Sequence, residues 1–391
     1  MKITFLTYNI FGMGGTVRTV VNTANFLVKK GYKVEIISVR KTSKKPLFYI
    51  DSRIRIKYLL DARRPGKNSK PLPIYKRIVK STLLKIPSVL IDKSEDLYHM
   101  FNLFTDIKLL RAIKNVKSGI LVTTIPSFNV LSVKFANKNI IKIGQEHKQF
   151  AIYNKSIQNK IKKYYGKLDA ISCLSENEVN DYKRIFPNGE VKIVKIENAT
   201  EIPEFYSNHT NKVIISAGRF VHEKGFDLLI EAFNKVVKKH PDWKLKIFGQ
   251  GVERSNMIEL IQKYNLSNNV LLLPKTNDIL NEMANASIYA LSSRNESFGM
   301  VIVEAMSVGL PCVCFACSGP REIIENEKDG ILVPEGDIDK FAERINQLIE
   351  DKELRKKIGM NGRESVKRYS FEEIGGKWDL LLEEVTKAKN I

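Results

Sequence analysis

The chain has 391 residues, of which 43% are hydrophobic, and its 64 lysines and arginines against 43 aspartates and glutamates give a net charge of +21. This length is enough for two domains with complete cores. No stretch of about 20 uninterrupted apolar residues occurs, which argues against a transmembrane helix, and Met1-Lys2 leads directly into a predicted strand with no secretory signal. We therefore expect a cytoplasmic protein, either free or attached to the inner face of the cell membrane.

The first elements are a predicted strand at 3–8, a glycine-rich turn at 12–15, an amphipathic helix at 17–29 and a second strand at 33–39. Strands and helices alternate in this way through both halves of the chain. This alternation predicts an α/β fold of two Rossmann-like, doubly wound parallel sheets, with a ligand in a cleft between the strand ends. The glycine turn lacks the Gly-x-Gly-x-x-Gly spacing of a dinucleotide-binding fingerprint.

Between residues 63 and 93, a polar stretch with prolines at 64–71 precedes a basic amphipathic segment. The residues that recur there at helical spacing are Ile74, Tyr75, Ile78, Val79, Thr82 and Ile86, and the basic residues on much of the other face are Lys76, Arg77, Lys80 and Lys85. Such a helix can lie on anionic lipid or pack as an ordinary surface helix on its own domain. We keep contact of residues 72–92 with the inner membrane surface as one hypothesis.

Two cationic side chains belong to one predicted strand-to-helix loop in the second half of the chain. Arg219 follows an apolar strand at 213–217, and Lys224 precedes the helix that begins near Phe226. Five residues apart, a guanidinium and an ammonium can approach an anion from two sides. Each of them alone is more often a surface cation, but the pair predicts a diphosphate site.

Two carboxylates, Glu296 and Glu304, lie eight positions apart around the predicted start of a helix near residue 300. The turn between a strand that ends near residue 292 and this helix has backbone N–H groups that can bind a diphosphate. Glu296 would then lie beside the sugar of a nucleotide-sugar, and Glu304, one to two helical turns further on, could reach a ribose.

Three of the four cysteines, Cys312, Cys314 and Cys317, fall within six residues, whereas Cys173 is isolated. Cys312 and Cys314 share one face of a predicted strand at 311–315, which favours buried thiols over metal ligands. We therefore expect no metal site, and reduced cysteines agree with a cytoplasmic protein.

Charge is divided unevenly between the two halves. Residues 1–200 contain 38 basic and 14 acidic residues, a net charge of +24, and residues 201–391 contain 26 and 29, a net charge of −3. A strongly basic first half attracts an anionic partner.

The motif Gly-Arg-Phe-x-x-x-Lys-Gly-Phe at 218–226, followed by Glu-x7-Glu at 296–304, resembles the donor site of the retaining GT-B glycosyltransferases of family 4, the glycosyl transferases group 1. The resemblance includes the glycine turn at 12–15, the strand at 141–147 and the Gly-Pro turn at 319–320. It implies an acceptor-binding Rossmann-like domain at 1–200, a donor-binding Rossmann-like domain at 201–375 and a C-terminal helix at 376–391 that returns to the first domain.

The resemblance assigns Arg219 and Lys224 to the leaving diphosphate, Glu296 to sugar hydroxyls and His147 to the donor sugar. A lone histidine after a strand is otherwise more often a structural hydrogen-bonding group. The other donor-binding residues that the resemblance implies are Gly14, Gly15, Lys275, Thr276, Ser297, Phe298, Gly299, Met300 and Glu304.

The resemblance also implies retaining, metal-independent transfer, without a cofactor, of a hexose or N-acetylhexosamine from a nucleoside-diphosphate sugar, for which UDP is the usual nucleotide. The charge of the first half favours an anionic acceptor, such as a teichoic acid or capsular glycopolymer or its lipid-linked precursor.

Two other classes of protein stay open. A sugar-nucleotide epimerase or a phosphorylase on the same fold could share the diphosphate site. A polyanion- or nucleic-acid-binding protein would also explain the positive charge, but the chain lacks an aromatic-basic binding repeat, and we expect no nucleic-acid partner. The sequence does not indicate an oligomeric state.

Overall fold

The structure is a computed structural model that describes residues 1–63 and 73–389. The polar stretch at 64–71 and the first residue of the 72–92 segment lie outside the described residues. The chain divides into two compact units: unit 1 contains Met1–Glu197 and Ile374–Ile391, and unit 2 contains Asn198–Glu373. The domain boundaries expected from the sequence were 200 and 375.

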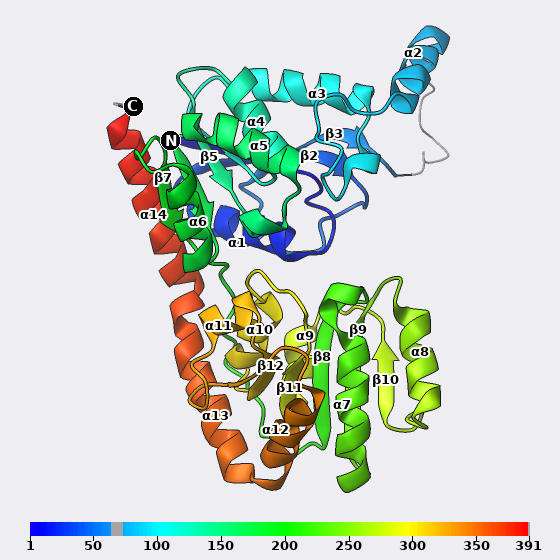
Figure 1. The fold of residues 1–391 in the computed structure, drawn as a ribbon. Helices are drawn as coiled ribbons and strands as arrows, with labels where there is room; N and C mark the ends of the chain where they lie inside the picture. Colours follow the sequence, from blue (N-terminus) through cyan, green and yellow to red (C-terminus); the bar gives the residue numbers. More distant parts are fainter. Residues whose placement is uncertain (64–72, 390–391) are drawn as a thin grey trace. The chain divides into compact units, whose positions relative to one another are not determined.

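Unit 1 is built on a seven-stranded parallel sheet with the order β3-β2-β1-β4-β5-β6-β7 (Figure 1). Its strands are β1 (Lys2–Thr7), β2 (Lys33–Lys41), β3 (Arg55–Asp61), β4 (Ile120–Thr123), β5 (Ile141–Gln145), β6 (Ala170–Cys173) and β7 (Lys192–Lys195). Its helices are α1 (Gly15–Lys29), α2 (Ile74–Lys85), α3 (Leu103–Lys114), α4 (Pro126–Phe135), α5 (Lys155–Tyr164), α6 (Glu176–Ile185) and most of α14 (Phe371–Ala388), with short 3₁₀ turns η1 (Tyr98–Met100), η2 (Phe150–Ile152) and η3 (Tyr165–Lys167). Every residue of β4, β5 and β6 is buried, as in a sheet that helices cover on both faces.

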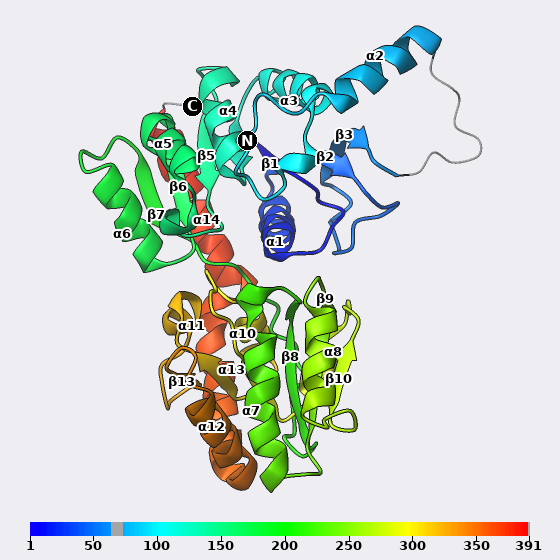
Figure 2. The ribbon, with the colours of Figure 1, turned by 45° about the vertical axis from the view of Figure 1, so that its right-hand side comes forward.

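Unit 2 is built on a six-stranded parallel sheet with the order β10-β9-β8-β11-β12-β13 (Figure 2). Its strands are β8 (Val213–Arg219), β9 (Lys244–Gln250), β10 (Val270–Leu273), β11 (Ile288–Leu291), β12 (Cys312–Phe315) and β13 (Ile331–Val333). Its helices are α7 (Phe226–Lys239), α8 (Arg254–Lys263), α9 (Ile279–Ala284), α10 (Met300–Ser307), α11 (Ser318–Ile323), α12 (Ile338–Glu350) and α13 (Lys352–Ser365), with η4 (His222–Lys224) and η5 (Val366–Tyr369). The two parallel sheets confirm the predicted fold class.

The order of strands reverses once in each sheet, between β1 and β4 in unit 1 and between β8 and β11 in unit 2. In open parallel sheets, ligands bind at the carboxyl ends of the strands beside such a switch point. The loops that follow β1, β8 and β11 are therefore where the topology favours a site. Gly14, Arg219 and Glu296 lie in or next to these loops.

The last helix, α14, begins at Phe371, five residues before the start expected from the sequence. The Ser370 hydroxyl accepts a hydrogen bond from the N–H of Glu373 at 3.3 Å, which is a helix N-cap contact. Further along, the helix packs on unit 1, where Trp378 is 1% exposed and the Tyr32 hydroxyl donates to Asp379 Oδ1 at 2.6 Å.

Candidate functional site

The candidate donor site in unit 2 begins where β8 ends. Arg219 is the last residue of this strand and pairs in register with Gln250 at the end of β9, so the sheet fixes its backbone. Its side chain is exposed and has no ion-pair or hydrogen-bond partner within residues 1–63 and 73–389. The guanidinium is therefore available to a ligand at the switch point.

The loop after β11 is tied to the loop after β8. The Arg294 guanidinium donates to both carboxylate oxygens of Asp227, at 2.8 and 2.6 Å, and to the carbonyl oxygen of His222 at 2.8 Å. Gly225 has a φ of +61°, and a Cβ at this position would lie 2.0 Å from the carbonyl oxygen of Ser292. Only glycine allows this conformation and this approach together, so the two loops can lie side by side. The sequence did not predict the Arg294–Asp227 contact.

This arrangement brings Lys224 and Glu296 into contact. The Lys224 ammonium donates to Glu296 Oε2, and the two side chains are 18% and 15% exposed. An ammonium has three N–H donors, so two of them remain for phosphate oxygens while one holds Glu296. The structure thus places a predicted phosphate-binding cation and a predicted sugar-binding carboxylate together.

The N-terminus of α10 adds backbone donors next to this pair. Gly299, the residue before the helix, has a φ of +101°, which favours glycine. Among the described residues, the N–H groups of residues 297–301 have no hydrogen-bond acceptor, as expected for the start of a helix. The side chain of Phe298 is buried and packs edge-on against Tyr369, with ring centroids 5.5 Å apart. Phe298 can therefore contribute to ligand binding only through its backbone.

The other predicted residues of unit 2 lie on α10 and after β10. Glu304 is in the second turn of α10 and is 4% exposed. Lys275 and Thr276 follow β10, the edge strand, where Lys275 is exposed and the Thr276 hydroxyl accepts from the N–H of Asp278 at 3.0 Å. Because β9 separates β10 from β8, these two residues stand two strand spacings, or about 10 Å, from the end of β8.

Three predicted site residues are in unit 1, at the carboxyl ends of β1 and β5. Gly14 has a φ of +147° before α1, and a Cβ added at Gly14 or Gly15 would meet no atom within 4 Å. His147 follows β5, and its Nε2 is buried with no hydrogen-bond partner among the described residues. Burial lowers the pKa of the His147 imidazole to about 4. The ring is therefore neutral at pH 7.

A buried carboxylate next to His147 was not predicted. Glu146 is 1% exposed; its Oε1 accepts from Asn129 Nδ2 at 2.8 Å and from the Tyr165 hydroxyl at 2.7 Å, and its Oε2 accepts from the Tyr153 hydroxyl at 2.8 Å. Burial raises the pKa of the Glu146 carboxyl to about 7. These bonds connect the end of β5 to α4 and to the residues on both sides of α5, so they fix the backbone from which His147 projects.

The four cysteines are free and buried, as expected for Cys312 and Cys314. Burial raises the pKa of the Cys312 thiol well above its usual value and that of the Cys317 thiol to about 12. Over the described ranges, no three or more histidine, cysteine, aspartate or glutamate side chains are grouped so that they could hold a metal ion. Nor does any helix there have the length and apolar character needed to cross a membrane.

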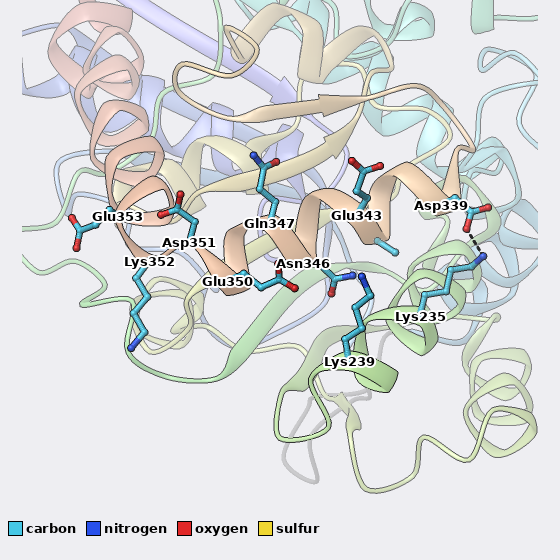
Figure 3. A pocket seen from close by; sticks show the side chains of 11 residues that line it. Lys235, Lys239, Asp339, Glu343, Asn346, Gln347, Glu350, Asp351, Lys352 and Glu353 are labelled. Atoms are coloured by element: carbon cyan, nitrogen blue, oxygen red, sulfur yellow. Dashed lines mark hydrogen bonds and ion pairs between the residues drawn. The ribbon is translucent and has the colours of Figure 1, made fainter.

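A groove with a volume of about 850 Å³ runs along α7 and α12 to the turn before α13 (Figure 3). Its walls carry charges of both signs, among them the ion pair of Lys235 and Asp339. It contains none of the predicted site residues and lies along helices rather than at strand ends. We therefore place the candidate donor site at the switch point of the sheet and not in this groove.

Three comparisons with known proteins bear on this site. The family model described as glycosyl transferases group 1 matches residues 198–365, which is most of unit 2. An exopolysaccharide phosphotransferase of Streptomyces coelicolor is 31% identical over 397 residues, which is 100% of this chain and 41% of that protein. A poly(ribitol-phosphate) alpha-N-acetylglucosaminyltransferase of Staphylococcus aureus is 29% identical over 283 residues, or 69% of this chain and 56% of that protein. The chain thus spans about half the length of these two relatives.

Among solved structures, a variant of Staphylococcus aureus TarM in complex with Fondaparinux, alpha-GlcNAc-glycerol and UDP aligns with a TM-score of 0.76 at 20% identity. The alignment covers 97% of this chain and 99% of that chain, so both units share its fold. The family match in unit 2 agrees with the predicted motifs at 218–226 and 296–304. Residues 198–365 therefore match the glycosyl transferases group 1, the family that the motifs resemble, and the two units together have the fold of the GT-B glycosyltransferases.

Proposed function

We propose that this enzyme transfers a hexose or N-acetylhexosamine from a UDP-sugar to a hydroxyl of an anionic cell-surface glycopolymer or its lipid-linked precursor, with retention of the anomeric configuration. The observation that carries the proposal is the group at the switch point of unit 2. There the loops after β8 and β11 hold an exposed cation, a lysine–glutamate pair and the first N–H groups of α10. All of these suit a sugar diphosphate.

The leaving diphosphate is the main target of this site. In glycosyl transfer, the bond between the anomeric carbon and the phosphate oxygen breaks, negative charge develops on the diphosphate, and stabilising that charge is the largest task of the protein. Arg219 offers a planar fork of donors and Lys224 a compact positive charge, while the N–H groups of residues 297–301 add backbone donors. With these fixed cations in place, the proposed reaction needs no divalent metal.

The remaining roles are proposed from the family resemblance. Glu296 is held by Lys224 beside the diphosphate site, so we assign it to hydroxyls of the donor sugar. We assign Glu304 to the ribose hydroxyls and the neutral His147 to the sugar, with Gly14 and Gly15 giving room for the substrates. Lys275 and Thr276 remain candidates for the edge of the base.

Retention requires the acceptor hydroxyl to approach the anomeric carbon on the face that the diphosphate leaves. A new bond then forms between the acceptor oxygen and the anomeric carbon, and the hydroxyl proton passes to the departing phosphate oxygen, which is the nearest base on that face. Glu296 has a positioning role in this scheme and is not a nucleophile. Its carboxylate is bound to the Lys224 ammonium and is therefore not free to attack the anomeric carbon.

The acceptor proposal rests on charge. Unit 1 has a net charge of +24 and unit 2 of −3, so an anionic acceptor is attracted to unit 1. Two relatives are an exopolysaccharide phosphotransferase and a poly(ribitol-phosphate) alpha-N-acetylglucosaminyltransferase, and the second of these names contains a phosphate-bearing polymer. Glycosyl transfer is preferred to phosphoryl transfer because the glycosyl transferases group 1 model covers the unit that holds the site.

A donor panel tests the proposal. UDP-, GDP- and ADP-sugars are incubated with poly(ribitol phosphate) or with a neutral glucan, and release of the nucleoside diphosphate is measured at 50 and 500 mM salt, with and without EDTA. We expect turnover with a UDP-sugar and the phosphate polymer that falls at high salt and is unchanged by EDTA. The coupling constant of the product's anomeric proton reports retention. Salt-independent use of the neutral glucan would contradict the acceptor, and turnover of donor alone or with orthophosphate would indicate an epimerase or a phosphorylase.

A further inference from the structure

The helix α2 exposes its apolar face. Tyr75, Ile78 and Val79 are 64%, 60% and 56% exposed, and their spacing of three and four residues places them on one side of the helix. In an ordinary surface helix the apolar stripe faces the core of its own domain. In both views of unit 1, α2 projects beyond the end of α3 (Figures 1 and 2). The hypothesis that α2 packs its apolar face on its own domain therefore does not describe this structure.

The base of α2 is firmly attached to α3. The N–H of Leu103 donates to the carbonyl of Ile86 at 2.9 Å, and Pro87 forms an antiparallel bridge with Asn102. Immediately afterwards, the Ser88 hydroxyl and the N–H of Val89 donate to the two carboxylate oxygens of Asp106, at 2.6 and 2.8 Å.

A second contact lies on the side of α2 opposite the apolar stripe. The Lys80 ammonium lies 5.8 Å from the ring centroid of Phe104 in α3. The apolar stripe thus lies on the side of α2 away from these contacts with α3. Exposed apolar residues continue beyond the helix at Val89, which is 73% exposed.

The charge of this segment indicates which kind of partner binds its exposed apolar face. Residues 73–91 contain four basic residues, Lys76, Arg77, Lys80 and Lys85, and no acidic residue. The nearest carboxylate along the chain, Asp92, is buried and paired with Lys160 at 2.7 Å. A basic segment with an apolar stripe suits an anionic lipid surface, where the stripe enters the boundary of the acyl chains and the cations contact headgroups. A second copy of unit 1, which also carries a net charge of +24, would be repelled.

We propose that α2, together with the residues up to Val89, docks unit 1 on an anionic lipid bilayer. This surface is independent of the proposed transfer reaction, because its residues lie outside the candidate donor site. Docking would concentrate the enzyme at the surface where a lipid-linked acceptor is found.

The test is flotation of the full chain with vesicles, without donor. Vesicles contain 30% phosphatidylglycerol in phosphatidylcholine, or phosphatidylcholine alone. We expect the parent to bind the anionic vesicles at 100 mM salt and to bind the neutral vesicles at least tenfold more weakly. The double variant I78D/V79D should bind the anionic vesicles at least tenfold more weakly than the parent.

The matched control is Leu380→Asp, which introduces the same acidic side chain at a 64% exposed leucine on α14 of the same unit. It should bind like the parent, and all variants should keep the parent's thermal stabilisation by UDP. Equal binding of the parent and I78D/V79D, or no binding by the parent, would overturn the proposal. A dimer of the parent in sedimentation that I78D/V79D converts to a monomer would assign the stripe to a second copy instead.

Discussion

Lys224→Met gives the sharpest test of the leaving-group assignment, because methionine keeps most of the stem and removes the ammonium. If Lys224 stabilises the departing diphosphate, kcat should fall by about 10²- to 10³-fold, which corresponds to about 3–4 kcal/mol of transition-state stabilisation. The donor KM should change less than kcat, because the charge on the leaving oxygen develops during the reaction.

The ion pair with Glu296 complicates a single substitution. Both side chains are largely buried, so removing Lys224 leaves the Glu296 carboxylate without its partner and can displace it. The double variant K224M/E296Q removes that uncompensated charge. If Lys224 acts on phosphate, the double variant should remain at least as slow as K224M. Recovery of kcat in the double variant to within about threefold of the parent would show instead that Lys224 serves only to neutralise Glu296.

The assay is the initial rate of UDP release with the donor and acceptor found in the panel. Thermal unfolding with and without UDP checks that each variant folds and binds nucleotide. Lys235→Met is the matched control, because Lys235 is a partly exposed lysine on α7 that pairs with Asp339 away from the candidate site. A K224M enzyme with kcat within about threefold of both the parent and K235M would refute the reasoning.

Three further predictions follow from individual residues. Glu304→Gln should raise the donor KM about tenfold or more with a smaller effect on kcat, and steady-state kinetics that show an unchanged KM would contradict the ribose assignment. Gly225→Ala should lower the melting temperature and abolish stabilisation by UDP, because its Cβ would lie 2.0 Å from the Ser292 carbonyl, whereas Gly336→Ala, which has a φ of +76° in open space, should cost less in a parallel melt. In Glu146→Gln, the melting temperature should rise more steeply from pH 4.5 to 6.5 than in the parent. Equal slopes of melting temperature against pH in the two proteins would show that the pKa of Glu146 is not raised in the folded protein.

The sequence was sufficient where a local pattern determines local structure. The apolar strand expected at 213–217 is the body of β8, and the helix expected near residue 300 begins at Met300. The start of α14 was placed too late, although Ser370 and Glu373 have the spacing of a capping box. The capping residues in the sequence mark the start of this helix, whereas the apolar pattern alone placed the start too late.

The long-range contacts that assemble the candidate site could not be predicted from local sequence patterns. Arg294 binds Asp227 across 67 positions, and Lys224 binds Glu296 across 72. The pairing of β8 with β11 brings their loops together, and many other residues contribute to that pairing. Sequence spacing predicted a diphosphate site at these residues, but only the topology shows which cation contacts which carboxylate.

Glu146 and His147 show how adjacent residues can have opposite effects on stability. The folded pKa of Glu146 is raised from 4.5 to about 7, so the folded protein binds more protons than the unfolded chain between these pH values, and stability falls as pH rises. The folded pKa of His147 is lowered from 6.5 to about 4, so the folded protein binds fewer protons in that window, and stability rises with pH. Each shift corresponds to about 3 kcal/mol, and the windows overlap between pH 4.5 and 6.5. The two contributions therefore largely cancel in the parent over this range. Glu146→Gln removes one of them, which leaves the rise from His147 uncompensated.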